Sequence, residues 1–431
     1  FKGKMRSSFV SKSAAAIKTQ KPTGSLKTKL NNGLKVVSQE NNGAISQLIL
    51  AFRAGSRYEK VTQPGLVHHV RNFVGRDAQS YPGLQLVWSS AASGANLNSF
   101  ATRDIFGVQI SVARDQAAYA LSILGHVAAK PAFKPWELED VTPTILADLS
   151  QKTPYGIVFE DIHRAAFRND SLSFSLYSSK GQVGAYKSQE LAKFAAKHFV
   201  SGNAVLVGIN VDGSILKSYA EECGVVPDGH IITNQGSPFR GGDYRRFARG
   251  NDVHIMVAGD GAAVGDLKFL AAQAVFLAHI GRASPLKFAS LPGSTSGLAL
   301  ANLPEGVTGS AFQAPYDGSG LVGVYLLATG ANADSAVRAT VKVLRTTQVQ
   351  DIEGCKRRAI ADILFNAENN VYSAYDLATN ALYNGPEQSE LIAEIQKIQE
   401  SDVQKYTKAA FERLAISAYG NYGRIPYADE L

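Results

Sequence analysis

The chain has 431 residues, of which 45% are hydrophobic and 19% are charged. This length exceeds one ordinary core and predicts two to four folding units, while the composition is that of a globular protein. No uninterrupted apolar run approaches the roughly 18 residues that a membrane-spanning helix needs, so membrane association is expected only through a partner.

The formal charge of +7 is concentrated at the start of the chain. Residues 1–39 contain nine basic side chains and no acidic one, and subtracting these nine from +7 leaves −2 for the remainder. A near-neutral body argues against a nucleic-acid-binding surface. Residues 1–24 are also rich in Ser and Ala, which is typical of an organelle transit peptide or its remnant.

The first half of the chain predicts short strands followed by amphipathic helices. Alternating apolar residues on either side of an Asn-Asn-Gly turn signal predict a hairpin over 26–38, and 45–53 predicts another strand. A helix is expected from about Pro64, because proline suits the first helical position. Further strands are predicted at 94–100, 105–113 and 204–211, and further helices at 115–130, 135–151 and 187–199.

Residues 224–250 are rich in Gly, Pro and polar side chains and show no sustained apolar period, which predicts an interdomain linker. Beyond this linker the pattern predicts strands at 252–258, 321–328 and 414–419, and helices at 265–280, 332–346, 352–366 and 401–412.

The two halves also match each other. Leu191, Phe194 and Phe199 precede the strand at 204–211 and have counterparts in Val403, Tyr406 and Phe411, an offset of 212 residues. We therefore predict a duplicated α+β unit, with an N-terminal domain at 25–223 and a C-terminal domain at 251–431.

The helix near Pro64 carries the most informative motif, GLVHHVRNFV at 65–74. His68, Arg71 and Asn72 are three and four residues apart and therefore share one helical face. In an H-x-x-E-H helix this spacing places two histidines on zinc and a glutamate on the metal-bound water. Here an arginine, which cannot accept a proton, stands at the glutamate position, and an asparagine stands at the second histidine position. The sequence thus predicts no catalytic residue, metal site or cofactor at this helix.

No alternative metal site is expected elsewhere. His69 is followed four residues later by Phe73, and no acidic residue lies between Glu59 and Asp77. The other histidines are scattered, and the two cysteines, far apart in the sequence, suggest neither a disulfide framework nor a haem or iron–sulfur site. A His-His pair on a helix is then more simply explained by packing.

In the order of its elements and in the motif at 65–74, the chain resembles the pitrilysin-like protease family, which includes the mitochondrial processing peptidase and the core proteins of respiratory complex III. The resemblance runs from the hairpin near Leu26 to the strand near Tyr419, and implies two homologous domains, each a mixed β-sheet flanked by helices. Active members carry G-x-x-H-x-x-E-H on the first helix and a third carboxylate ligand on a later helix. Gly65 and His68 keep this frame, and the third-ligand position falls at Asp148. The resemblance implies that His68 and Asp148 are remnants of a lost zinc site.

Three further segments, at 98–112, 132–141 and 239–246, are similar to segments of the complex III core proteins. The resemblance implies a non-catalytic scaffold and assembly subunit of ubiquinol–cytochrome c reductase, peripheral on the matrix side of the mitochondrial inner membrane. Its implied partners are a homologous core protein and the cytochrome b, cytochrome c and Rieske-type subunits of a dimeric complex. The alternative is the non-catalytic, substrate-binding alpha subunit of the processing peptidase, which has a longer Gly-rich loop not found near 289–320.

Overall fold

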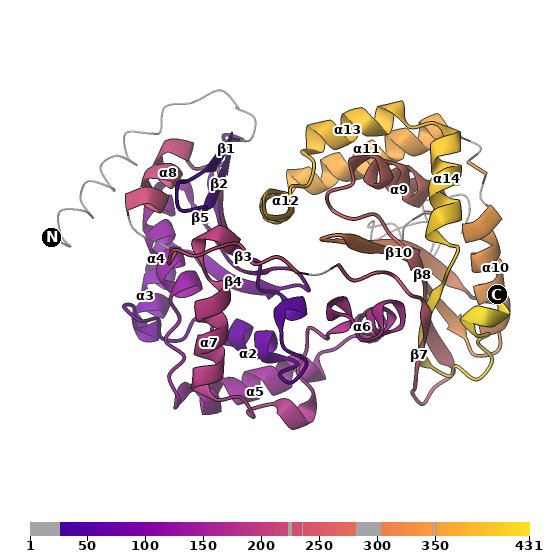
Figure 1. The fold of residues 1–431 in the computed structure, drawn as a ribbon, viewed down its shortest axis with the longest axis horizontal. Coiled ribbons are helices and arrows are strands. Elements are labelled where there is room, and N and C mark those ends of the chain that lie inside the picture. The colour runs from indigo at the N-terminus through magenta and orange to yellow at the C-terminus, as the bar shows by residue number, and fades with distance from the viewer. Residues whose placement is uncertain (1–25, 223–225, 235, 282–302, 347, 350) are drawn as a thin grey trace. The chain divides into compact units, whose positions relative to one another are not determined.

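The computed structural model describes residues 26–222, 226–234, 236–281, 303–346, 348–349 and 351–431. Two segments discussed above lie outside the described residues: the expected transit peptide at 1–24, and residues 289–302 of the region at 289–320. The chain forms two compact units, each assembled from separate stretches of sequence (Figure 1). Unit 1 consists of Phe1–Ser150, Ser175–Asn234 and Ala367–Tyr383, and unit 2 consists of Gln151–Phe174, Gln235–Asn366 and Asn384–Leu431.

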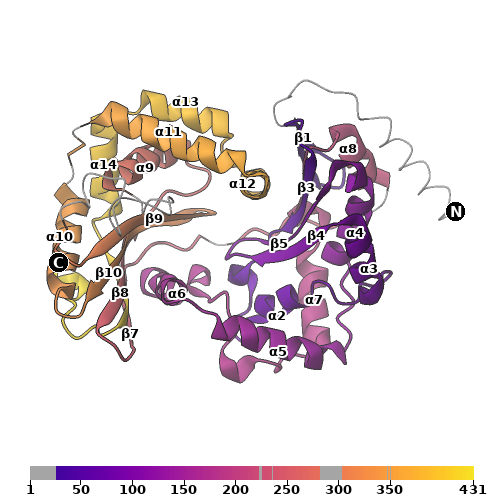
Figure 2. The same ribbon diagram turned by 180° about the vertical axis from the view of Figure 1, so that it is seen from behind.

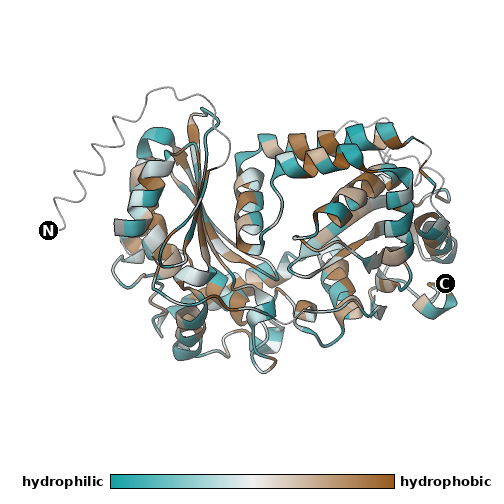
Figure 3. Ribbon diagram, turned by 45° about the horizontal axis from the view of Figure 1, so that its top comes forward, coloured by the Kyte–Doolittle hydropathy of each residue, from teal (hydrophilic) through white to brown (hydrophobic). Residues whose placement is uncertain are grey.

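Unit 1 is built on a six-stranded mixed sheet in the order β1-β2-β6-β3-β5-β4. The parallel pair is β2 with β6, and the other neighbouring strands run antiparallel. Hydrophobic residues follow the strands of this sheet, drawn in brown in Figure 3. The strands are β1 (Leu26–Lys29), β2 (Lys35–Gln39), β3 (Ile45–Phe52), β4 (Asn96–Ala101), β5 (Phe106–Ala113) and β6 (Ala204–Ile209).

The helices of unit 1 bury the apolar side of this sheet. Leu48 and Leu50 of β3, Val108 of β5 and Leu121 of helix α4 are all fully buried in one core. Burial of such side chains from water is the main stabilising contribution to the unit. The helices are α2 (Leu66–Asn72), α3 (Gly83–Ser93), α4 (Ala117–Ala129), α5 (Glu137–Ser150), α7 (Ser188–His198), α8 (Gly213–Glu222) and α12 (Asn370–Tyr383).

Unit 2 repeats this topology with five strands in the order β7-β11-β8-β10-β9. Figure 2 labels β7, β8, β9 and β10 of this sheet. Here β7 and β11 are parallel and the other neighbours antiparallel, as in the series β2-β6-β3-β5-β4 of unit 1. The predicted α+β fold with two homologous units is therefore confirmed. The strands are β7 (Gly242–Phe247), β8 (Asp252–Asp260), β9 (Thr308–Tyr316), β10 (Ser319–Thr329) and β11 (Ala415–Gly420). The helices are α6 (Pro154–Phe167), α9 (Leu267–Ile280), α10 (Ala333–Thr346), α11 (Ile352–Glu368), α13 (Gln388–Lys397) and α14 (Glu400–Ala410).

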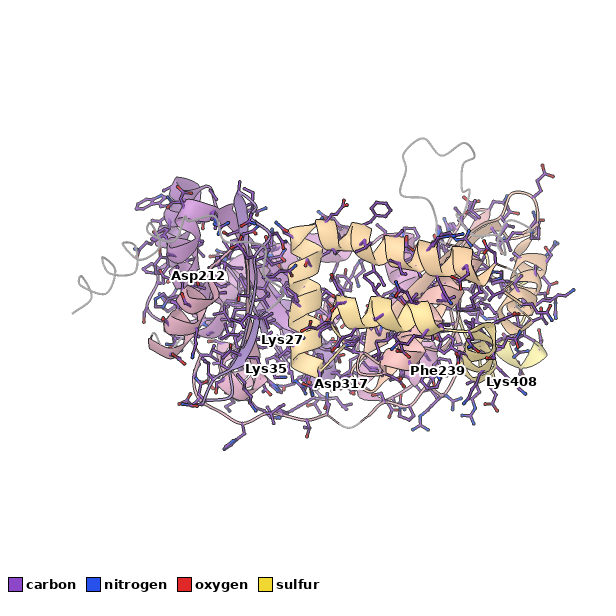
Figure 4. The ribbon with its side chains drawn as sticks, turned by 90° about the horizontal axis from the view of Figure 1, so that it is seen from above. Lys27, Lys35, Asp212, Phe239, Asp317 and Lys408 are labelled. Carbon is purple, nitrogen blue, oxygen red and sulfur yellow. The ribbon has the colours of Figure 1, made fainter. Side chains whose placement is uncertain are left out.

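Each unit contains one helix from the other half of the sequence. Helix α6 packs on β11, β8 and β7 of unit 2, and α12 packs on the equivalent strands β6, β3 and β2 of unit 1. The C-terminal end of α12 receives two cations, because Lys35 (labelled in Figure 4) donates to Ala381 O and Arg53 donates to Leu382 O. Positive charge at a helix C-terminus is stabilising. The compact units therefore differ from the contiguous domains expected at 25–223 and 251–431.

The expected linker at 224–250 also contains part of a sheet. Its residues 242–247 form β7, which pairs along its whole length with β11. The sequence pattern missed this strand because β7 lies at the sheet edge and its residues are half-buried or exposed, so apolar alternation does not develop. Among the described residues, no helix has both the length and the apolar character needed to cross a bilayer.

Candidate functional site

Helix α2 starts in a tightly packed position. Gly65 precedes it with a φ of 85°, a left-handed value that glycine adopts without strain. A Cβ at Gly65 would lie 2.5 Å from the Ser178 Cα, so glycine also lets the Ser178 backbone approach the helix. The Glu59 carboxylate accepts hydrogen bonds from Gly65 N and Val67 N, both at 2.7 Å, and so satisfies donors that a helix start leaves unpaired. Burial raises the pKa of Glu59 to about 8, although these two bonds favour the charged form.

The motif side chains on α2 converge on one carboxylate oxygen of α5. His68 Nε2 lies 3.1 Å and Asn72 Nδ2 lies 3.4 Å from Asp148 Oδ2. The Arg71 guanidinium forms an ion pair with the same oxygen. The structure thus brings together His68, Arg71, Asn72 and Asp148, which the sequence had linked to one lost site. Their contacts join α2 to α5.

The hydrogen bonds of His68 define its tautomer. Ser178 N donates to His68 Nδ1 at 3.2 Å, so Nδ1 is the acceptor and Nε2 carries the proton that is donated to Asp148. The ring is 1% exposed and packs edge-on against Tyr177, with 5.3 Å between ring centroids. Burial lowers the pKa of His68 to about 4, and the charge of Arg71 lowers it as well, whereas the bond to Asp148 opposes this shift. His68 is therefore neutral at physiological pH, with both nitrogens in use.

This cluster has the opposite polarity to a zinc centre. A zinc site directs lone pairs of nitrogen or oxygen at a cation, whereas here three donors point at one anionic oxygen. Burial would raise the pKa of Asp148, but the Arg71 charge and the bonds from His68 and Asn72 hold it below its usual value. The guanidinium supplies the positive charge next to the carboxylate. The residues at this position therefore do not fit a zinc ion.

The other side chains near α2 also have structural partners. His69 Nδ1 donates to Gly65 O at 2.9 Å, and its Nε2 accepts from Gly184 N at 3.2 Å, so this ring holds the start of α2 and the 184 loop together. Across the part of the chain that the structure describes, no group of three or more His, Cys, Asp or Glu residues is placed to hold a metal ion. The sequence did not predict the roles of Tyr177 and Ser178, because no local motif indicates that this segment packs against His68.

Comparison with known proteins gives a family match over part of the chain. Residues 35–180 match the family described as Insulinase (Peptidase family M16). This segment spans β2 to α6 and contains all four residues of the cluster. Within residues 35–180 the chain is therefore similar to peptidase family M16, and this matched segment contains the Arg71–Asp148 ion pair.

The similarity to particular proteins extends over almost the whole chain. The chain is 27% identical to Cytochrome b-c1 complex subunit 2, mitochondrial, of Homo sapiens over 416 residues, which cover 94% of this chain and 91% of that protein. It is also 27% identical to the Rattus norvegicus protein of the same name over 418 residues, with the same coverage. It is 25% identical to Mitochondrial-processing peptidase subunit alpha-2 of Dictyostelium discoideum over 394 residues, 88% of each chain.

Proposed function

We propose that this chain is a non-catalytic core subunit, of the core protein 2 type, of the mitochondrial cytochrome b-c1 complex. The observation that carries the proposal is the similarity to subunit 2 of that complex over 94% of the chain. The ion pair at the metalloprotease motif gives independent support for a role without catalysis. The subunit then contributes scaffold and assembly to a complex whose other subunits carry the electrons.

Loss of catalysis follows from the chemistry of the cluster. A metal-dependent peptidase needs a cation that polarises the substrate carbonyl and a base that activates water. The guanidinium of Arg71 carries only N–H donors and no acceptor, so it cannot serve as that base. Asp148 is occupied by three donors, and His68 Nε2 carries a proton in place of a free lone pair. Neither of the two requirements is met by these side chains.

In this proposal the chain pairs with a core protein 1 homologue and joins the cytochrome b, cytochrome c and Rieske-type subunits of a dimeric complex. It lies on the matrix side of the mitochondrial inner membrane and reaches the membrane through those subunits. The basic, Ser- and Ala-rich segment 1–24 supports mitochondrial import. The near-neutral charge of the remaining chain supports protein rather than nucleic-acid partners.

The test is native isolation of the tagged chain in mild detergent, with mass spectrometry of the copurifying subunits and measurement of zinc per chain. We expect cytochrome b, cytochrome c and Rieske-type subunits, with no zinc attributable to the α2–α5 cluster. Recovery with a zinc-bearing processing peptidase instead would refute this assignment. That result would establish the alternative role as its alpha subunit, which the similarity to the Dictyostelium protein supports less strongly.

A further inference from the structure

Helix α3 presents an apolar stripe to solvent. Its sequence, GLQLVWSSAAS, contains no charged residue. Leu84, Val87 and Trp88 are 62%, 59% and 66% exposed, and Ala91 is exposed on the same side. These four residues, spaced by three and four, form one helical face, which we name the α3 face. A surface helix of a globular protein ordinarily turns charged and polar residues outward, so this face is unusual.

The α3 face continues toward the second tryptophan of the chain. Trp136, 67% exposed, lies beneath the Lys134 ammonium, which is 5.4 Å from the ring centroid. Lys134 pairs with Asp77, and Asp77 Oδ1 accepts a hydrogen bond from Gly83 N at 2.7 Å at the start of α3. Trp136 is thereby held at the N-terminal end of the helix. Both tryptophans of the protein are thus solvent-exposed on this side of unit 1.

The helix beneath this face is firmly held. Leu86 is 2% exposed and belongs to the core of unit 1. Tyr81 donates or accepts a hydrogen bond at 2.6 Å with Ser89 and stacks on His126 of α4, with 5.8 Å between centroids. Figure 1 shows α3 beside α4. The exposed side chains therefore belong to a fixed helix, which reduces the ordering cost of binding.

The size and the surroundings of the face indicate a protein partner. Two largely exposed tryptophans with Leu84 and Val87 present on the order of 500 Å² of apolar surface, near the upper end for a monomer. With its rim, this area approaches the roughly 800 Å² that each partner buries in a stable interface. Tryptophan is also enriched at the centres of such interfaces, where charged residues are depleted.

The rim has charges of both signs. Arg76 lies 3.4 Å from Asp140, and Lys134 pairs with Asp77. An anionic bilayer surface would favour an excess of basic residues around the apolar centre. We propose that the α3 face docks an apolar surface of another protein subunit of the same complex. This inference rests on the proposed function, because the partner belongs to the complex in which that function places the chain.

The experiment combines crosslinking with a charge substitution in the full, tagged chain. A photoreactive amino acid replaces Val87, and in a second chain it replaces Phe247, a 69% exposed residue of unit 2. Trp88→Asp is compared with Phe247→Asp, and thermal unfolding of both purified chains checks that they fold. We expect the probe at 87 to crosslink to one subunit of the isolated complex. Trp88→Asp should lower recovery of the chain in the complex at least tenfold, whereas Phe247→Asp should leave it unchanged.

Three results would overturn the inference in distinguishable ways. If the wild-type chain copurifies with the complex but the probe at 87 forms no protein adduct and Trp88→Asp assembles normally, the docking surface is wrong while the proposed function stands. If the probe at 87 reacts with phospholipid alone, the face contacts a bilayer and the protein partner is excluded. If the wild-type chain does not copurify with the complex at all, the proposed function fails, and this inference fails with it.

Discussion

Removal of the Arg71 charge should destabilise unit 1 measurably. The side chains of Arg71 and Asp148 are 27% and 26% exposed, so their ion pair is mostly but not fully buried. Exposed pairs contribute about 0.2–1 kcal/mol, whereas loss of one partner from a fully buried pair costs about 3–5 kcal/mol. For this intermediate case we expect Arg71→Met to lower the free energy of unfolding by about 1–2 kcal/mol. In a cooperative unit of roughly 150–250 residues, each 1 kcal/mol lowers Tm by roughly 2–4 °C.

A double-mutant cycle separates the ion pair from general packing. Asp148→Asn should also destabilise the protein, because the Arg71 charge then loses its partner. The double variant should recover part of the combined loss, since neither charge remains without a counter-charge. Arg76→Met is the matched control: Arg76 and its partner Asp140 are 36% and 61% exposed, and little effect is expected there. Calorimetry or denaturant unfolding of the purified chain measures all four variants.

The titration of His68 gives a second, independent readout. The charge of Arg71 lowers the pKa of His68, so Arg71→Met should raise it from about 4. NMR of the imidazole resonances would follow this change. If Arg71→Met costs no more than Arg76→Met, if the double variant is simply additive, and if the His68 pKa does not move, the guanidinium does not hold α2 and α5 together.

Three other perturbations test the fold and the site. Fragments 25–234 and 235–431 should fold only when coexpressed, because the first lacks α12 and the second lacks α6, the helices that pack on their sheets. Cooperative thermal unfolding of either fragment alone would contradict this requirement. His198 is 2% exposed, and burial lowers its pKa to about 4. Between pH 6.5, its ordinary pKa, and about 4, the unfolded chain binds a proton at His198 that the folded chain does not. The free energy of unfolding therefore falls by about 1.4 kcal/mol for each pH unit as the pH is lowered through this range. His198→Phe should flatten that part of the stability curve, and an unchanged curve would count against it. The variant R71E/N72H should retain about one zinc per chain after dialysis, whereas N72H alone should not, because the guanidinium remains; equal zinc in both would show that Arg71 is not the obstacle.

The strands with clear apolar alternation were predictable from sequence, as was the motif face of α2. Residues 45–53 and 105–113 correspond closely to β3 and β5, because their side chains enter a core and local burial produces a regular pattern. The spacing of His68, Arg71 and Asn72 likewise fixes which residues share a face, whatever the helix packs against.

Other features depend on contacts between distant segments. Helices α6 and α12 were not predicted. Local periodicity also does not indicate that α6 packs on the sheet of unit 2 and α12 on the sheet of unit 1. The strand β7 lacks apolar alternation because it is an edge strand. The bond from Ser178 N to His68 Nδ1 requires that two segments 110 residues apart meet at Gly65, which the sequence alone does not specify.

The most direct test of the scaffold role is depletion of the endogenous chain, followed by rescue with wild type or with the variant R71M/D148N, which removes both charges of the ion pair between α2 and α5. Native gels and ubiquinol–cytochrome c reductase activity report the assembled complex, and presequence cleavage reports processing. The account predicts loss of the complex on depletion and restoration by both chains, with presequence cleavage unchanged throughout. An intact complex after depletion, together with accumulation of unprocessed precursors, would contradict it.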